Sequence, residues 1–195
     1  KYFFFYLYYK LKAGTFNFQT GYNSKDFGAN SFYSLKYPDQ FESTKTQFVS
    51  LGYQSNTVIK IVPVFYLRRN RDLFELRRNN DSIPFNHHQT NTAGMNLNVW
   101  AKHRLGKTSL GIDLRHEHII SNVLGDLLDI PIKVPHFDSV FYTRFYSRMN
   151  VSLYAEHSVS WDKLTVNAGI MAHHNSDLKG FMFYPGIDLS YMFDK

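Results

Sequence analysis

Hydrophobic and polar residues alternate one by one along most of this chain. In one stretch Leu97 and Val99 fall on one side of an extended backbone, while Asn96 and Asn98 fall on the other. The same alternation recurs over 49–54, 108–115, 150–156, 164–170 and 187–193. A period of two is the signature of a half-buried β-strand, whereas a helix needs a period of 3.6. No segment matches the helical period comparably, so the sequence predicts an all-β protein.

The pattern predicts nine strands in an antiparallel up-and-down meander. Their ranges are 2–10, 14–22, 44–55, 57–76, 90–104, 108–121, 148–160, 163–175 and 181–194. The connections between them are of two kinds. Short ones (10–14, 55–57, 105–107 and 160–163) alternate with long ones (21–43, 77–89, 122–147 and 175–180). In a meander this order places every long loop at one end of the sheet and every tight turn at the other.

This arrangement is typical of a transmembrane β-barrel, in which alternate residues face lipid and a wet lumen. Backbone polar groups in hydrocarbon must pair within a closed sheet, which explains why strands can cross only as a barrel. Aromatic residues near strand ends, such as Tyr53, Trp161 and Phe193, suit an interfacial girdle. A soluble antiparallel sandwich or ligand-binding barrel also alternates. Against it, the polar faces carry glycine and the apolar faces are rich in Ala, Val and Leu.

Composition narrows the class further. Aromatic residues make up 17% of the 195 residues, while the mean hydropathy is only −0.35, so apolar and polar positions are interleaved. No apolar run approaches the roughly 18 to 20 residues of a membrane helix. The start 2–9, YFFFYLYY, is too short for one and lacks the features of a signal peptide. With no initial Met and an odd strand count, the chain is expected to be an internal fragment of a longer protein.

Several segments of this chain have a recognisable sequence. The first is KDFGANSFYSLKYPDQFESTKTQFVSLGY, 25–53. The others are PVFYLRRNRDLFELRR (63–78), NTAGMNLNVWAKHRLGKTSLGIDLRHEHIISNVLG (91–125), VNAGIMAHHNSD (166–177) and FYPGIDLSYMF (183–193). These segments resemble the barrel of TonB-dependent outer-membrane receptors of Bacteroidota type, most closely the cobalamin-receptor-like group. The resemblance covers nearly the whole chain. It implies that 1–195 is a partial receptor barrel, about nine strands of a 22-stranded one, without the plug domain and TonB box.

The resemblance also implies a function, active import of a scarce bulky nutrient, with cobalamin or a related corrinoid as the expected cargo. Extracellular loops would capture the ligand, and a TonB-type energy-transducing protein would act through the plug that this sequence lacks. The expected partners are outer-membrane lipid, the nutrient ligand and a surface lipoprotein lid, with no nucleic acid. The expected location is the outer membrane of a Gram-negative cell.

The loop 21–43 is the candidate capture loop. Its aromatic rings are expected to stack on a flat ligand, and its charged residues to supply polar contacts. The ligand-binding candidates are Lys25, Asp26, Phe27, Phe32, Tyr33, Tyr37 and Phe41. An alternative is that these rings pack the loop against itself and the barrel rim.

Other chemistry is less well supported by the residues. His116 and His118 share a strand face, but nothing fixes the third ligand that zinc needs. Calcium through Asp26, Asp39 and Glu42, or through Asp126 and Asp129, lacks the spacing of a known loop site. No nucleophile elbow, phosphate-binding glycine loop or H-E-x-x-H is present, so no enzyme, no cofactor and no metal are expected.

Two local features complete the expectations. The formal net charge is +6, but the basic run 68–71 is followed by Asp72 and Glu75, which favours a solvated strand end over a nucleic-acid site. Pro131 and Pro135 disfavour a central strand, so 130–138 is predicted to be loop, or a short extended segment across the barrel mouth. The remaining alternatives are a small closed outer-membrane barrel, acting as a passive pore or adhesion protein, and a soluble binding barrel.

Overall fold

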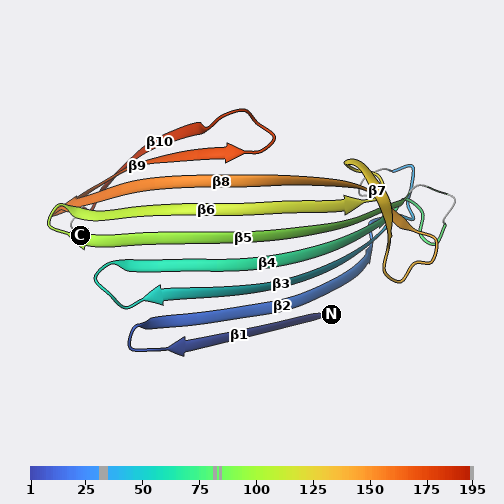
Figure 1. The fold of residues 1–195 in the computed structure, drawn as a ribbon, viewed down its shortest axis with the longest axis horizontal. Helices are drawn as coiled ribbons and strands as arrows, with labels where there is room; N and C mark the ends of the chain where they lie inside the picture. Colours follow the sequence, from blue (N-terminus) through green and yellow to red (C-terminus); the bar gives the residue numbers. More distant parts are fainter. Residues whose placement is uncertain (31–34, 81–82, 84, 194–195) are drawn as a thin grey trace.

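The computed structural model describes residues 1–30, 35–80, 83 and 85–193, and these residues form a single antiparallel sheet (Figure 1). Its strands are β1 (Tyr2–Lys10), β2 (Gly14–Gly28), β3 (Phe41–Ser55), β4 (Lys60–Glu75), β5 (Phe85–His103), β6 (Gly106–Ser121), β7 (Asp126–Lys133), β8 (Phe141–Trp161), β9 (Leu164–Asn175) and β10 (Met182–Tyr191). Within this described part, no helix is long and apolar enough to span a membrane.

The strands pair in the order β1-β2-β3-β4-β5-β6-β8-β9-β10, so neighbours in sequence are neighbours in the sheet. This confirms the predicted all-β up-and-down meander. Every pair in this order is antiparallel and runs in unbroken register, for example Gly14↔Ser55 through Gly28↔Phe41 between β2 and β3. Among the described residues, β1 and β10 lie at the two edges and do not pair with each other.

Several strands are longer at the loop end than the sequence pattern predicts. The predicted strand 14–22 continues to Gly28, and its partner begins at Phe41 instead of residue 44. The loop predicted at 21–43 is therefore reduced to 29–40. The apolar alternation ends near residue 22, but the backbone ladder continues with polar side chains, and the Ser43 hydroxyl donates to Asp26 Oδ1 at 2.5 Å.

The prediction of loop over 130–138 is wrong for its first part. Residues Asp126–Lys133 form a tenth strand, β7, which contains Pro131. It pairs only with the end of β8, and the register shifts between Leu127 and Ile132. Proline is tolerated there because β7 is an edge strand and its register is already broken at that point.

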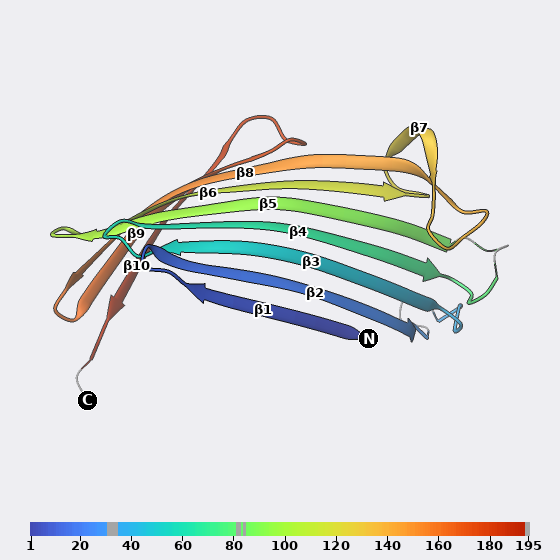
Figure 2. The same cartoon turned by 60° about the horizontal axis from the view of Figure 1, so that its bottom comes forward.

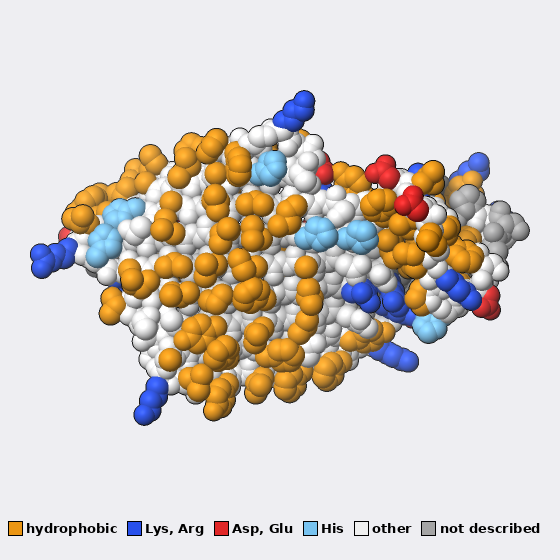
Figure 3. Space-filling model, in the orientation of Figure 1, with side chains coloured by type: hydrophobic (Ala, Val, Ile, Leu, Met, Phe, Trp, Pro, Cys, Tyr) orange, Lys and Arg blue, Asp and Glu red, His pale blue; other side chains and the backbone are white. Residues whose placement is uncertain are grey.

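The sheet is arched (Figures 1 and 2), and the registers give its two faces different chemistry. Figure 3 looks onto the convex face, where orange side chains cover the strands. We call these side chains the apolar belt; in cross-strand rows they include Leu7, Phe18, Leu51, Phe65, Met95, Leu114 and Val151, then Leu97, Ile112, Leu153, Ala172 and Phe183, then Ile61, Val99, Leu110, Ala155 and Ile170.

The belt has no second layer packed on it in the described part of the chain. Many of its side chains are about half exposed, such as Phe65 at 50%, Leu110 at 54% and Ile170 at 49%, and the others are partly exposed. Among the residues that the structure describes, the buried hydrophobic ones are Ala29, Ile120, Val134 and Tyr142. The sheet is therefore not one wall of a conventional core.

The concave face is mainly polar, and its side chains form hydrogen bonds across strands. Tyr154 donates to Asn98, the Asn98 amide donates to Asn96 at 3.2 Å, and the Asn96 amide donates to Asp113 at 3.3 Å. Farther along, Glu117 forms ion pairs with Arg115 and Arg148. These residues face the side opposite to the belt because each lies one position from a belt residue.

Long and short connections separate to opposite ends of the sheet, as predicted. The tight turns at 11–13, 56–59, 104–105 and 162–163 lie at one end, and the longer connections at 29–40, 76–84, 122–140 and 176–181 lie at the other. At the loop end, residues 126–140 fold back onto the convex face, and we call this segment the cap (Figure 2). Val134 of the cap packs with Ile120 and Tyr142 in a small core.

Candidate functional site

The predicted ligand residues do not converge on one site. Lys25, Asp26 and Phe27 lie in the paired end of β2, not in a loop. Register places Lys25 and Phe27 on the concave face and Asp26 on the convex face. Phe32 and Tyr33 lie outside the described residues.

The other two candidates lie apart from these. Tyr37 is in the connection 29–40, where the Lys36 ammonium lies 5.6 Å from the centre of its ring. Phe41 begins β3 on the convex face, and the Arg78 guanidinium lies 4.3 Å from its ring centroid. Phe41 also lines the cleft described next. The role of the seven residues in ligand binding stays a prediction.

A cleft of about 380 Å³ opens on the convex face where the apolar belt meets the cap. Its floor contains a basic cluster, Lys45, Arg69 and Arg71, on neighbouring strands, and its wall is the cap segment 134–137. Lys45 lies directly across from Arg71 in the β3–β4 ladder, and Arg69 lies across from Gln47. Three cations therefore share one face within two successive cross-strand rows.

Hydrogen bonds orient both guanidinium groups of the basic cluster. Arg69 Nε donates to Asn91 Oδ1 at 2.7 Å, and Arg71 Nε donates to Gln89 Oε1 at 2.8 Å. Both acceptors are neutral amides on β5, so they fix the side chains without neutralising their charge. In the described part of the chain, none of the three cations belongs to the ion pairs found, which involve Arg115, Arg148 and Lys133 instead.

His87 anchors the cap over the loop end of the sheet. Its ring lies 4.6 Å from Phe137 of the cap and 5.4 Å from Phe85, centroid to centroid. The backbone amide of His87 donates to Asn122 Oδ1 at 2.8 Å, which ties the start of the cap connection to β5. Burial, with a smaller contribution from neighbouring His88, lowers the pKa of His87 from 6.5 to about 4. The ring is therefore neutral at pH 7.

His116 and His118, the two histidines considered as metal ligands, have other contacts in the structure. His116 and His118 do share the convex face, as their alternate positions require. His116 Nε2 shares a 2.7 Å hydrogen bond with Ser147 Oγ, and the His118 ring lies 6.2 Å from that of Phe145. Within the described ranges, no three His, Asp or Glu side chains gather in a way that could hold an ion.

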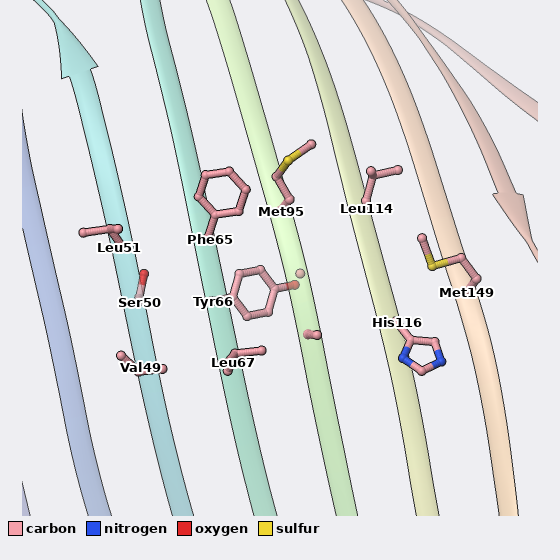
Figure 4. Close-up of a pocket in the computed structure, with 12 residues that line it drawn as sticks. Val49, Ser50, Leu51, Phe65, Tyr66, Leu67, Met95, Leu114, His116 and Met149 are labelled. Atoms are coloured by element: carbon pink, nitrogen blue, oxygen red, sulfur yellow. The ribbon is translucent and has the colours of Figure 1, made fainter.

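A shallow depression of about 520 Å³ lies on the belt beside the cleft (Figure 4). Figure 4 shows Phe65, Met95 and Leu114 side by side on neighbouring strands, with Leu67 and Val49 in the next row. A larger groove of about 770 Å³ shares Val49 and Leu67 with it. That groove also contains Arg69, so an apolar surface leads directly to the basic cluster.

Sequence reasoning missed the basic cluster as a unit. It read 68–71 as a single basic run, but Arg68 faces the concave side while Arg69 and Arg71 face the convex side. The period of two already implied that division. What the sequence did not indicate is that Lys45, more than twenty residues earlier, lies directly across from Arg71.

Comparison of the chain with protein-family models, with curated proteins and with solved structures gives no match in any of the three.

Proposed function

We propose that this chain forms part of the wall of an outer-membrane β-barrel, with its convex face toward lipid and its concave face toward a wet lumen. The observation that carries the proposal is the half-exposed apolar belt on the convex side of a sheet whose concave side is polar. Soluble proteins rarely leave an apolar surface of this extent uncovered. Hydrocarbon is the solvent in which such a face is stable.

The height of the belt supports this proposal. In β5 the belt runs from Ala93 to Ala101 on alternate residues. At about 3.4 Å per residue this is about 27 Å along the strand. A strand inclined to the membrane normal would then present a band somewhat shorter than that, close to the roughly 25 Å of lipid-facing barrels.

The belt also moves along the strands from one edge of the sheet to the other. The belt residues of β1 centre between Phe5 and Leu7, at the level of Arg115 of β6, whereas those of β10 centre on Ile187, at the level of Thr108. That is a drift of seven residues, about 24 Å, across eight strand spacings of about 4.8 Å each. A belt that stays level in a membrane therefore requires strands tilted by about 30°, a little below the roughly 35–45° of transmembrane barrels.

The two rival architectures fit less well. A soluble binding barrel encloses its apolar residues, so its apolar face would be concave, whereas here it is convex (Figures 2 and 3). A small closed barrel needs its first and last strands to pair, and β1 and β10 do not pair among the described residues. A larger barrel is favoured.

Within this class, we propose a TonB-dependent receptor that imports a scarce bulky nutrient, with a corrinoid as the cargo. The resemblance of segments such as 25–53 and 91–125 supports this choice. All long connections lie at one end, as extracellular capture loops require. The motor protein, the plug and a lipoprotein lid belong to this proposal.

The test is a titration of the full-length protein, purified in detergent, with cyanocobalamin, followed by tryptophan and tyrosine fluorescence. A variant with 30–39 replaced by a short Gly-Ser link removes the candidate capture loop but leaves the β2–β3 ladder intact. A control variant shortens 176–180 in the same way. We expect saturable binding that is lost in the first variant and kept in the second.

The titration tests the cargo and the membrane barrel separately. A folded barrel that binds no cyanocobalamin would exclude the corrinoid and leave the transporter. A monomer that is soluble without detergent would exclude the membrane barrel itself.

A further inference from the structure

The cleft and the groove together have the chemistry of a site for an amphipathic anion. The cleft holds the basic cluster, and the adjoining groove is lined by Phe3, Val49, Leu67 and Ala93 of the belt. The two hollows share Tyr22, Gln47 and Arg69, so one ligand can occupy both.

We propose that this surface binds a phosphorylated, multiply acylated glycolipid of the surrounding membrane. The phosphate would be held by the basic cluster, and the acyl chains would lie along the belt. The proposal rests on the proposed function, because it places the belt in lipid, but it adds a ligand site on the outer wall, away from the lumen.

The position of the cluster along the strands matches a headgroup. On β4 the convex face changes from Phe65 and Leu67 to Arg69 and Arg71 within four residues. On β3 it changes in the same way from Leu51 and Val49 to Gln47 and Lys45. Cations immediately beyond the apolar band lie at the level of lipid phosphates, where each contributes attraction to an anionic surface.

The side chains of the basic cluster are already oriented to bind an anion. Arginine presents its remaining guanidinium N–H groups in a fixed fork that suits phosphate oxygens, and Asn91 and Gln89 already hold the Nε end of each side chain. The nearest carboxylate on this face in the β2–β3 ladder is Asp26, one cross-strand row beyond Lys45, and it accepts the hydroxyl of Ser43. Lys45 and Arg71 repel each other across the ladder, and a bound phosphate would relieve that repulsion.

The cap completes the site on the side away from the belt. Val134, Pro135 and Phe137 form an apolar wall facing the cations, and His136 lies among them at a positive φ of 73°. A sugar ring between the phosphate and the cap would find apolar contacts on one side and cations on the other. A free inorganic anion would gain nothing from this wall or from the belt.

The test uses the full-length protein in dodecyl maltoside micelles and lipid A as the probe, with binding followed by native mass spectrometry. Lys45→Gln, Arg69→Gln and Arg71→Gln are combined in one variant, which keeps polar side chains but removes three charges. The control variant combines Lys60→Gln, Lys102→Gln and Lys107→Gln at the turn end, with the same change in charge. We expect the first variant to bind lipid A at least about tenfold more weakly and the control to stay within about twofold.

A second arm needs no variant and changes the ligand instead. Lipid A without its phosphates should bind the unaltered protein about as weakly as lipid A binds the first variant. Inorganic phosphate at millimolar concentration should not displace lipid A. Displacement by inorganic phosphate would instead assign the cleft to a free anion and overturn the lipid site.

Failure of this inference can be told from failure of the proposed function. A protein that needs detergent and migrates as a folded barrel, but binds lipid A equally with and without the cluster, would overturn the lipid site alone. A protein that stays in solution without detergent and binds no lipid A would overturn both.

Discussion

The two faces of this sheet are built from the same strands, yet their side chains differ in polarity and in how they are satisfied. The concave face satisfies its polar groups with one another, as in the chain from Tyr154 through Asn98 and Asn96 to Asp113. The convex face leaves large hydrophobic side chains half exposed. Under the proposed function, adjacent residues on one strand lie in different solvents, lipid and water, and the difference between them can be measured one position at a time.

The largest effect is expected from a charge placed on the belt. Leu153 and Ser152 are neighbours on β8 and face opposite sides. In a bilayer, Leu153→Arg should lower the free energy of unfolding by about 2–4 kcal/mol, because a cation near the midplane is poorly solvated. Ser152→Arg on the polar face should cost less than about 1 kcal/mol. Urea unfolding in lipid vesicles measures both.

An equal loss of unfolding free energy in the two variants would mean that both faces of the sheet meet the same solvent. Leu153 is already 43% exposed in the isolated sheet, so Leu153→Arg should be well tolerated if that face meets water. The same pair of variants thus separates a lipid-facing belt from an exposed but aqueous one.

A second contrast lies within the convex face, between the belt and the part that the chain covers with its own cap. His87 lies under the cap with a pKa lowered to about 4, because burial disfavours its charged form. In the unfolded chain the pKa is about 6.5. The neutral ring contributes its full stability above about pH 6.5, and that stability is lost as the pH falls toward 4.

We expect acidification to loosen the cap by an amount on the order of 2 kcal/mol. Hydrogen-exchange protection of the amides in 134–140, corrected for intrinsic rates, should fall between pH 7 and pH 4. His87→Phe should remove this fall, while His157→Gln at the opposite end of the sheet should leave it unchanged. A cap equally protected at both pH values in the unaltered protein would contradict the assignment.

These contrasts also mark what the sequence could and could not predict. Period-two alternation predicted the meander and the division into a loop end and a turn end, because both depend on local pattern. It ended strands too early, as at Asn23–Gly28, since the β2–β3 ladder continues after the apolar alternation stops. The cap was missed because Pro131 and Pro135 argue against a strand. Residues 128–133 do alternate between apolar and other side chains, but β7 forms only by pairing with the end of β8.

The basic cluster could not be predicted from local pattern, because it depends on the register between strands. Arg69 and Arg71 could be placed on one face from their spacing, but Lys45 joins them only through the β3–β4 register. The wall of the cleft comes from 134–137, more than sixty residues farther along the chain. Charge counts along the sequence do not contain these pairings, which is why the run 68–71 was read as a solvated strand end.

The smallest effect tests how closely the concave face is packed. The Tyr154 ring lies over Gly111 on the neighbouring strand, and a Cβ built at Gly111 would come within 2.0 Å of Tyr154 Cζ. Gly111→Ala should therefore push the ring aside, break its hydrogen bond to Asn98 and cost about 1–2 kcal/mol in urea unfolding. Gly186→Ala, where a Cβ meets nothing within 4 Å, is the matched control and should cost less than about 0.5 kcal/mol.

A double-mutant cycle completes this test. In a Tyr154→Ala background the space above Gly111 is open, so Gly111→Ala should lose most of its cost, and the coupling energy should be about 1 kcal/mol. A Gly111→Ala cost that persists without the Tyr154 ring would mean that the backbone of β6, and not the ring packed on it, requires glycine. The ordered polar face would then owe less to side-chain packing than the contact between Tyr154 and Gly111 indicates.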